Sequence, residues 1–293
     1  MKKQYLFAAI SILGWSTVAT VVKLLLGSMN SFQVLCISAL LASLFLFAVS
    51  CITGSIKKLT TYKPRDYLIS VLIGLPGTFF YYIFYYSGTS FMLASQAFIV
   101  NYLWPIMCVV FACIILKEKL TAVKLLALGL SFVGVIVVVG RDILSFEWHT
   151  LIGAALCALG AICYGIFTAF NKKSAYEKPH TMMISFFASF LLTSVICLVR
   201  GDFPILNGVQ LLGMAWNGIV SSGIASTLWQ LALSGADTAK ISNLAYITPF
   251  LSMIWTWLIL GEEISPWSLI GLGIIMLGIL IQLWFGDKRK KNP

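Results

Sequence analysis

Charged side chains are scarce in this sequence, and acidic ones are the scarcer kind. The chain has 293 residues, of which 10% are charged and 60% are hydrophobic. A soluble globular domain usually carries about a quarter of its residues as charged ones. A water-soluble core of this size cannot hide so much apolar surface, so the excess must face lipid. The composition therefore excludes a soluble protein.

Motifs of catalysis and nucleotide binding are missing as well. No GxSxG, HExxH, Walker A or GxGxxG stands in a fitting context. The two histidines, His149 and His180, lie at predicted membrane borders. We therefore expect no enzyme activity, no metal and no cofactor. Because no nucleotide-binding motif is present, transport by this chain would be secondary or would use another subunit.

The basic residues and the cysteines do not suggest other classes of partner. The net charge is +10, but no basic stripe with interleaved aromatic residues suits nucleic acid. The seven cysteines lie within apolar runs, form no CxxC pair and are odd in number. This pattern predicts free, buried thiols rather than disulfides or a zinc site.

What the sequence does contain is ten apolar segments joined by short connections. Each is near the ~20 residues that cross a bilayer as a helix, and lipid offers no partner to free backbone groups, so helices are required. The first segment follows a basic start without a clear cleavage site, and we interpret it as an uncleaved helix. The predicted segments are 4–26, 32–54, 66–86, 91–116, 122–140, 149–170, 180–200, 209–233, 238–260 and 266–286.

Basic residues predict the orientation. If the N-terminus is cytoplasmic, all but three of the 20 Lys and Arg residues belong to the inner connections and termini. The exceptions are Arg141 and Arg200 on the outside and Lys23 within the first segment. Cytoplasmic loops of membrane proteins carry such an excess. We therefore expect a multi-pass protein of the plasma membrane with both termini in the cytoplasm.

The chain also repeats itself. The stretch 101–134 aligns without a gap with 245–278, which superposes Pro105 on Pro249 and Glu118 on Glu262. The repeat divides the chain into halves, 1–145 and 146–293. Because each half has five helices, an odd number, the halves cross the membrane in opposite directions. Inverted repeats are a recurring transporter architecture with the substrate site between them.

Prolines and glycines interrupt several segments. Pro76 in the third segment, Pro105 in the fourth and Pro249 in the ninth remove backbone hydrogen bonds and kink helices. In membranes such breaks are tolerated where they line protein or a water-filled cavity. We favour a cavity role, as hinges or kinks, since Pro105 and Pro249 recur at matched repeat positions. Plain kinking for packing is the alternative.

Aromatic and polar side chains at membrane depth are the candidates for a binding site. Tyr and Trp need partners for their OH and NH groups when buried, and a cavity with polar neighbours supplies them. An interfacial belt or lipid-facing bulk is the alternative. Asn101 either binds substrate or joins helices, and its place beside Trp104 and Pro105 favours binding. The aromatic candidates are Trp15, Tyr82, Tyr102, Trp104, Tyr164, Trp229 and Tyr246.

Ionisable groups are nearly absent from the predicted spans. Lys23 lies toward the outer end of the first helix, where it either snorkels to the surface or attracts a carboxylate or phosphate of the substrate. No carboxylate lies in the middle of any segment. Proton-coupled exchange therefore has no obvious proton carrier in the sequence.

Several of these motifs resemble a known family. The stretches GWSTVATVVK (14–23) and ILGEEISPWSLIGLGIIMLG (259–278) are similar to the EamA family of the drug/metabolite transporter superfamily. Within it, VNYLWPI (100–106) and GAICYGIFTAFNKK (160–173) resemble aromatic amino acid exporters of the YddG type, which tend to have tryptophan where Tyr164 stands. The resemblance implies an all-α membrane protein with ten helices in two inverted five-helix repeats. It also implies alternating access about a central cavity and export of amino acids. It places six side chains near that cavity: Trp15, Tyr102, Trp104, Tyr164, Trp229 and Tyr246.

Two transport functions and one unrelated class remain as hypotheses. The first is export of amphipathic or aromatic amino acids. The second is transport of quaternary amines or other organic cations, held in an aromatic cage by cation–π attraction. The third is a membrane scaffold or lipid-modifying enzyme, which scattered carboxylates such as Glu118 and Asp237 do not favour. Expected partners are a small-molecule substrate and the lipid bilayer, with monomer and homodimer both open.

Overall fold

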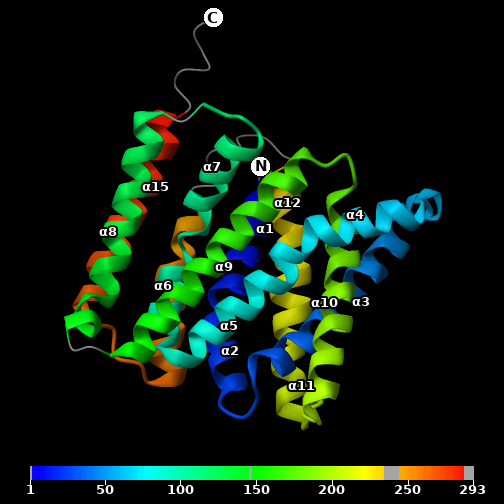
Figure 1. Ribbon diagram of the computed structural model, residues 1–293, viewed down its shortest axis with the longest axis horizontal. Coiled ribbons are helices and arrows are strands. Elements are labelled where there is room, and N and C mark those ends of the chain that lie inside the picture. The colour runs from blue at the N-terminus through cyan, green and yellow to red at the C-terminus, as the bar shows by residue number, and fades with distance from the viewer. Residues whose placement is uncertain (1, 120, 145–146, 234–243, 287–293) are drawn as a thin grey trace, which may run out of the picture.

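A computed structural model describes residues 2–119, 121–144, 147–233 and 244–286, and Figure 1 shows a bundle of helices. These residues contain no strand. The first half comprises α1 (Lys2–Ser16), α2 (Val18–Leu26), α3 (Ser31–Ile52), η1 (Ser55–Thr61), α4 (Pro64–Leu75), η2 (Pro76–Phe80), α5 (Tyr81–Phe91), α6 (Ala94–Asn101), α7 (Trp104–Ile115) and α8 (Ala122–Leu144). The second half comprises α9 (Trp148–Lys173), α10 (Lys178–Arg200), α11 (Gly208–Ala215), η3 (Trp216–Ile224), α12 (Ala225–Leu233), η4 (Ala245–Ile247), α14 (Thr248–Trp255), η5 (Thr256–Leu260) and α15 (Pro266–Gly286).

The described helices fall into the ten predicted segments. Six continuous runs among them are long and apolar enough to cross a membrane, and shorter apolar helices account for others. The α1–α2 run begins at the N-terminus, whereas α9, the sixth segment, runs the opposite way, since five segments precede it. The fold is therefore an all-α membrane protein of ten helices in two inverted five-helix repeats around a central cavity, as predicted.

Local sequence explains where several helices begin and end. Asn30 caps α3 and Asn207 caps α11. The side chain of Asn30 accepts from two amides of the first turn and that of Asn207 from one, and a glutamine three residues on completes a capping box in each case. Gly201 and Gly261 end α10 and η5 in the left-handed region, with φ of 68° at both, which a Cβ would disfavour.

The third segment is longer than predicted. The sequence SGTS (87–90) is predicted to be a connection, yet α5 continues to Phe91. The hydroxyl of Thr89 donates to the carbonyl of Tyr85 at 2.8 Å, and that of Ser90 donates to the carbonyl of Ser87 at 2.7 Å. Because these hydroxyls are satisfied within the helix itself, the polar residues do not end it.

Interruptions occur at the three predicted prolines. Pro76 begins η2, a π-helical turn between α4 and α5, and the second half has a π-helical stretch at η3 in the corresponding eighth segment. The fourth segment breaks between Asn101 and Trp104, with Pro105 in the first turn of α7. Pro249 lies in the first turn of α14. Their action as hinges stays a prediction.

Each half packs against the other through matched helices. The helix α3 contacts α10, α8 contacts α15, α5 contacts α9 and α1 contacts α12, so every pair joins the two repeats (Figure 1). Close contact depends on glycine at some crossings. A Cβ added to Gly134 in α8 would lie 2.7 Å from the carbonyl oxygen of Gly271 in α15. Only glycine permits that approach.

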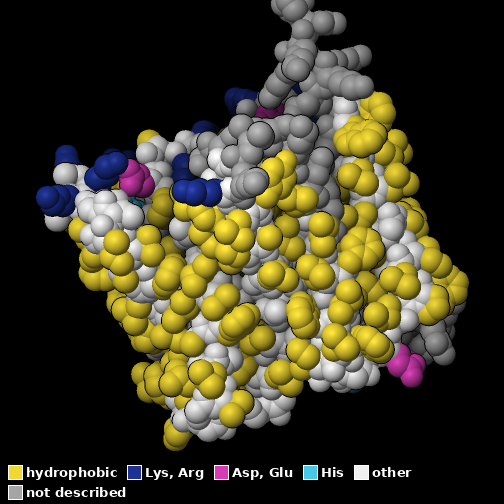
Figure 2. All heavy atoms as spheres, turned by 180° about the vertical axis from the view of Figure 1, so that it is seen from behind, with side chains coloured by type: hydrophobic (Ala, Val, Ile, Leu, Met, Phe, Trp, Pro, Cys, Tyr) yellow, Lys and Arg dark blue, Asp and Glu magenta, His cyan; other side chains and the backbone are white. Residues whose placement is uncertain are grey.

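Charge and apolar surface are separated along the bundle. Figure 2 shows hydrophobic side chains covering the middle of the face, with Lys and Arg gathered toward one end. We call that end, where the first helix starts, the basic end; the other, formed by loops 27–30, 92–93, 201–207 and 261–265, is the opposite end. Lipid in contact with the middle band explains the many large apolar side chains that are exposed there. The basic end carries Lys57, Lys58, Lys63, Lys117, Lys119, Lys172, Lys173 and Lys178.

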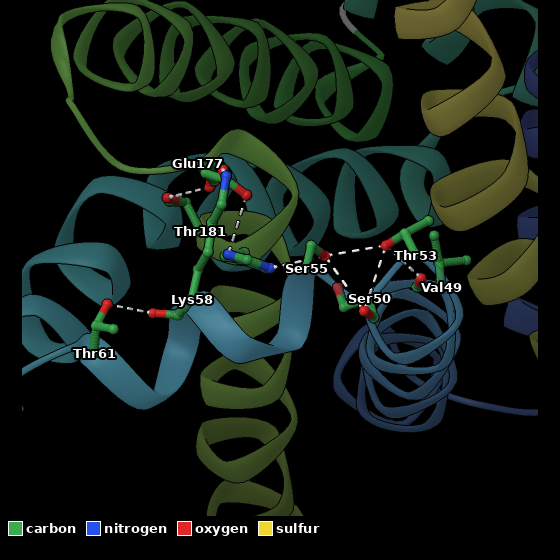
Figure 3. Close-up of polar contacts among 9 residues, drawn as sticks. Val49, Ser50, Thr53, Ser55, Lys58, Thr61, Glu177 and Thr181 are labelled. Atoms are coloured by element: carbon green, nitrogen blue, oxygen red, sulfur yellow. Dashed lines mark hydrogen bonds and ion pairs between the residues drawn. The ribbon is translucent and has the colours of Figure 1, made fainter.

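A polar cluster at the basic end joins η1 to the start of α10 (Figure 3). Lys58 reaches Glu177 in an ion pair, and this donor lowers the pKa of the Glu177 carboxyl from its usual value. Beneath them, the ring of His180 is fully buried, with Nε2 at 3.3 Å from Oγ of Ser55. The cluster fixes the loop between the second and third segments against the seventh.

Candidate functional site

A cavity of about 480 Å³ lies between the two repeats. Its walls come from the first, third, fourth, sixth, seventh, eighth and ninth helical segments. Asn171, Lys172 and Lys178 belong to its lining and stand at the basic end, so the cavity extends from the interior of the bundle to that end. In transporters built from inverted repeats, the substrate site lies in this position between the repeats.

One wall of the cavity is aromatic and is contributed by the third, fourth and sixth segments. The rings of Trp104 and Tyr164 meet edge to face, with centroids 5.4 Å apart. Tyr164 also contacts Tyr81 at 5.0 Å, and Trp104 contacts Tyr102 at 6.1 Å. These separations are those of favourable aromatic pairs, so the rings support one another in a fixed arrangement.

Another part of the lining carries two tryptophans from opposite repeats. Trp15 of α1 and Trp229 of α12 lie with ring centroids 5.3 Å apart. The indole nitrogen of Trp15 donates to the carbonyl of Ser221 at 3.1 Å, within the π-helical stretch η3. The irregular backbone of η3 therefore supplies a partner for a half-buried indole, which explains how Trp15 is accommodated at depth.

Polar contacts at the cavity bridge the aromatic residues. Tyr82 shares a hydrogen bond of 3.1 Å between its hydroxyl and that of Ser222. The side-chain amide of Asn101 donates to the hydroxyl of Tyr81 at 3.0 Å. The hydroxyl of Tyr102 donates to the carbonyl of Ala245 at 2.7 Å, across the repeat interface.

Five buried polar atoms of lining residues lack a hydrogen-bond partner within the described part of the chain. They are the hydroxyl oxygen of Tyr85, Oδ1 of Asn101, Asn171 and Asn217, and Oγ1 of Thr248. Asn101 is only 4% exposed and Thr248 only 3% exposed. Buried polar atoms of this kind are nearly always hydrogen-bonded, so each such exception requires an explanation. A ligand in the cavity with donors of its own would satisfy acceptors such as Oδ1 of Asn101 and Oγ1 of Thr248.

The charged side chains that line the cavity, among the described residues, are Lys172 and Lys178. Lys172 also pairs with Glu118 at 3.3 Å. The ammonium of Lys178 donates to the carbonyls of Asn171 and Ser174 at the C-terminal end of α9. No carboxylate belongs to the described lining. The mouth of the cavity is therefore positive, and its depth is uncharged.

The structure brings most of the predicted site residues together in this lining. They are Trp15, Tyr82, Asn101, Tyr102, Trp104, Tyr164 and Trp229. The side chain of Tyr246 lies outside the described residues. Pro76, Pro105 and Pro249 stand at the helix interruptions beside the cavity.

Lys23 is not part of the described lining. Its ammonium donates to the carbonyl oxygens of Thr89 at 2.8 Å and Met92 at 2.6 Å, at the opposite end. With its ammonium bonded to these carbonyls, Lys23 lies away from the described cavity lining. The sequence suggested no partner for Lys23 because both acceptors are backbone atoms far away in the chain.

Sequence reasoning missed Thr248. An isolated threonine in an apolar segment usually bonds to its own helix, and this gave no reason to single it out. The signal that could have found it is its position directly before Pro249. In the repeat alignment, Thr248 matches Trp104, which stands directly before Pro105.

Comparison with known proteins gives the family. The model of the EamA-like transporter family matches residues 2–140 and 151–284. An uncharacterized transporter of Clostridium kluyveri is 25% identical over 100% of this chain and 96% of its own length. The aromatic amino acid exporter YddG of Ancylobacter novellus is 24% identical over 62% of this chain and 64% of its own length.

A solved crystal structure shares the fold. It superposes with a TM-score of 0.71 at 19% identity, over 98% of this chain and 99% of the other. The relatives named above are described as transporters, and the described helices are those of a multi-pass membrane protein. The protein is thus a membrane transporter, and the chain belongs to the EamA-like transporter family.

Proposed function

We propose that this protein is a secondary-active exporter of aromatic and other amphipathic amino acids, working by alternating access. The observation that carries the proposal is a cavity with aromatic walls, unsatisfied polar atoms such as Oδ1 of Asn101, and no described carboxylate. The partial likeness to a YddG exporter supports the same substrate class. The basic end would lie in the cytoplasm of a cell bounded by the plasma membrane.

The polar groups suit the two charges of an α-amino acid. Oδ1 of Asn101 is an unsatisfied acceptor. An ammonium group can only donate hydrogen bonds, so it suits this atom. Tyr81 accepts from the Asn101 amide at 3.0 Å, which leaves its own O–H to donate to a carboxylate. The two groups are hydrogen-bonded neighbours, as recognition of an ammonium and a carboxylate on one carbon atom requires.

The aromatic wall suits the side chain of the solute. Trp104, Tyr164 and Tyr102 present adjoining rings within the cavity. Aromatic pairs contribute about 0.5–1.5 kcal/mol beyond the burial of their area. A substrate ring packed there would gain this energy and would leave the uncharged depth of the cavity free of water.

Transport of organic cations is the second candidate, and the same rings favour it. An aromatic cage attracts a quaternary amine by up to ~2 kcal/mol or more per ring when desolvated. The positive mouth counts against it, since Lys172 and Lys178 repel an approaching cation. A zwitterion experiences no net repulsion of this kind. We therefore rank amino acids first.

Counterflow in proteoliposomes tests the proposed function. Vesicles loaded with unlabelled tryptophan are expected to accumulate external labelled tryptophan transiently, because a carrier exchanges solute faster than the gradient decays. Excess phenylalanine and tyrosine should suppress the signal, whereas choline and tetramethylammonium should not. Protein-free vesicles are the control. Suppression by the quaternary amines alone would replace the first candidate with the second, and an absence of saturable tryptophan accumulation would contradict the first.

A further inference from the structure

Glu262 makes a set of contacts that the site described above does not use. Its carboxylate is 8% exposed and lies at the opposite end, just after η5. Oε1 accepts from the backbone N–H of Ala94 at 2.7 Å. Oε2 accepts from the backbone N–H of Ser95 at 2.9 Å and from its hydroxyl at 2.7 Å. All three bonds cross from the second repeat to the first.

The carboxylate oxygens of Glu262 lie at the N-terminus of α6. The first amides of a helix have no partner inside it, and its N-terminus carries a partial positive charge. In α6 the N-cap position is Leu93, whose side chain cannot accept a hydrogen bond. Glu262 therefore caps α6 from the other repeat, with charge-assisted bonds that are about twice as strong as neutral ones.

Lys23 holds the other side of the same junction. Its bonds to the carbonyls of Thr89 and Met92 fix the last turn of α5 and the connection to α6. A cation at the C-terminal end of a helix is favoured by the helix dipole. The junction between α5 and α6 is thus held by an anion on one side and a cation on the other.

The capped helix leads directly to the binding cavity. The helix α6 has eight residues, begins at Ala94 and ends at Asn101. At 1.5 Å per residue it is about 12 Å long and behaves as a short rigid rod. A shift of its capped end therefore moves the Asn101 amide, which faces the cavity. Conversely, a solute bound at Asn101 acts on the contact with Glu262.

We propose that Glu262 is a positioning residue that locks the opposite end closed and couples this lock, through α6, to Asn101. While the three bonds hold, the repeats stay together at the opposite end and the cavity is reached from the basic end. Release of α6 from Glu262 accompanies opening at the opposite end. The proposal concerns the conformational cycle and does not depend on which solute the cavity binds.

Hydrogen–deuterium exchange of the purified protein in nanodiscs tests this lock, with Glu262→Gln as the variant. A neutral amide accepts more weakly than a carboxylate, so the lock should open more often. Amides of residues 92–98 and of η5 should exchange roughly tenfold faster, which corresponds to about 1.4 kcal/mol. Amides at the basic end, in 104–116 and 171–178, should exchange more slowly, because alternating access closes one end as the other opens.

Glu263→Gln is the matched control. Glu263 is the adjacent residue, carries the same charge and is exposed, so its exchange pattern should equal that of the wild type. Ser95→Ala provides a milder variant, since it removes one of the three bonds and keeps the carboxylate. It should show the same reciprocal pattern with smaller amplitude.

Faster exchange confined to the first turn of α6, with no change at the basic end, would show a purely structural cap and overturn the proposal. Equal effects of Glu262→Gln and Glu263→Gln would overturn it too, because a general loss of charge would then explain the result. None of these readouts uses a transported solute, so a wrong substrate class would leave this test intact.

Discussion

Replacement of Asn101 by leucine is expected to lower the rate of tryptophan counterflow about 100-fold at subsaturating substrate. Leucine has the branched shape of asparagine, but it offers no acceptor to the ammonium group of the solute. Binding is weakened strongly when a charged group of the solute is left without its hydrogen-bond partner. A 100-fold lower rate corresponds to about 2.7 kcal/mol. The measurement is the initial rate of labelled tryptophan uptake into preloaded proteoliposomes.

An analogue without the ammonium group serves as the control for this effect. Indole-3-propionate has the ring and the carboxylate of tryptophan but no amine. Its weaker competition in the wild type should be nearly unchanged in Asn101→Leu, since the lost acceptor had no partner on this molecule. If both solutes lose the same factor, Asn101 acts by holding Tyr81 in place, and its assignment to the ammonium is wrong.

Replacement of Gly165 by valine is expected to destabilise the protein and disrupt the aromatic wall together. A Cβ at Gly165 would lie 2.7 Å from the backbone carbon and oxygen of Met107 in α7. Backbone cannot move aside as a side chain can, so α7 must separate from α9. Such overpacking costs about 1–3 kcal/mol, which should lower Tm by roughly 5–10 °C in a thermal scan of detergent-solubilised protein.

The functional consequence follows from the neighbours of Gly165. Trp104 begins α7 and Tyr164 precedes Gly165 in α9, so separating these helices pulls apart a ring pair now 5.4 Å between centroids. Gly129→Val is the matched control, because a Cβ at Gly129 has no heavy atom within 4 Å. Equal changes in Tm for the two variants would mean that glycine content, and not the crossing of α7 with α9, determines stability.

The sequence predicted the fold well because the membrane restricts the alternatives. Apolar length sets each helix, and the observed breaks at Pro76, Pro105 and Pro249 follow from the missing N–H of proline. The sequence did not predict that α5 extends beyond its expected end. That extension depends on hydroxyls such as Thr89 bonding to their own backbone, a choice that composition alone leaves open.

The cavity was predicted in part for a comparable reason. Aromatic residues placed in the middle of apolar segments, such as Trp15 and Trp104, have polar atoms that lipid cannot satisfy. The sequence therefore indicates that these side chains face the interior of the bundle. Lys23 and Glu262 have partners more than 60 residues away in the chain, and those partners are mostly backbone atoms. No residue pattern marks such contacts, so their role became visible only in three dimensions.

Counterflow of tryptophan through Trp104→Ala, measured beside Trp257→Ala, tests the central claim most directly. Both variants remove one indole, but Trp104 lines the cavity whereas Trp257 is exposed on the apolar surface of η5. The account predicts that accumulation of labelled tryptophan is lost in Trp104→Ala and kept in Trp257→Ala. Undiminished accumulation in Trp104→Ala would contradict the assignment of this cavity as the site of an aromatic amino acid.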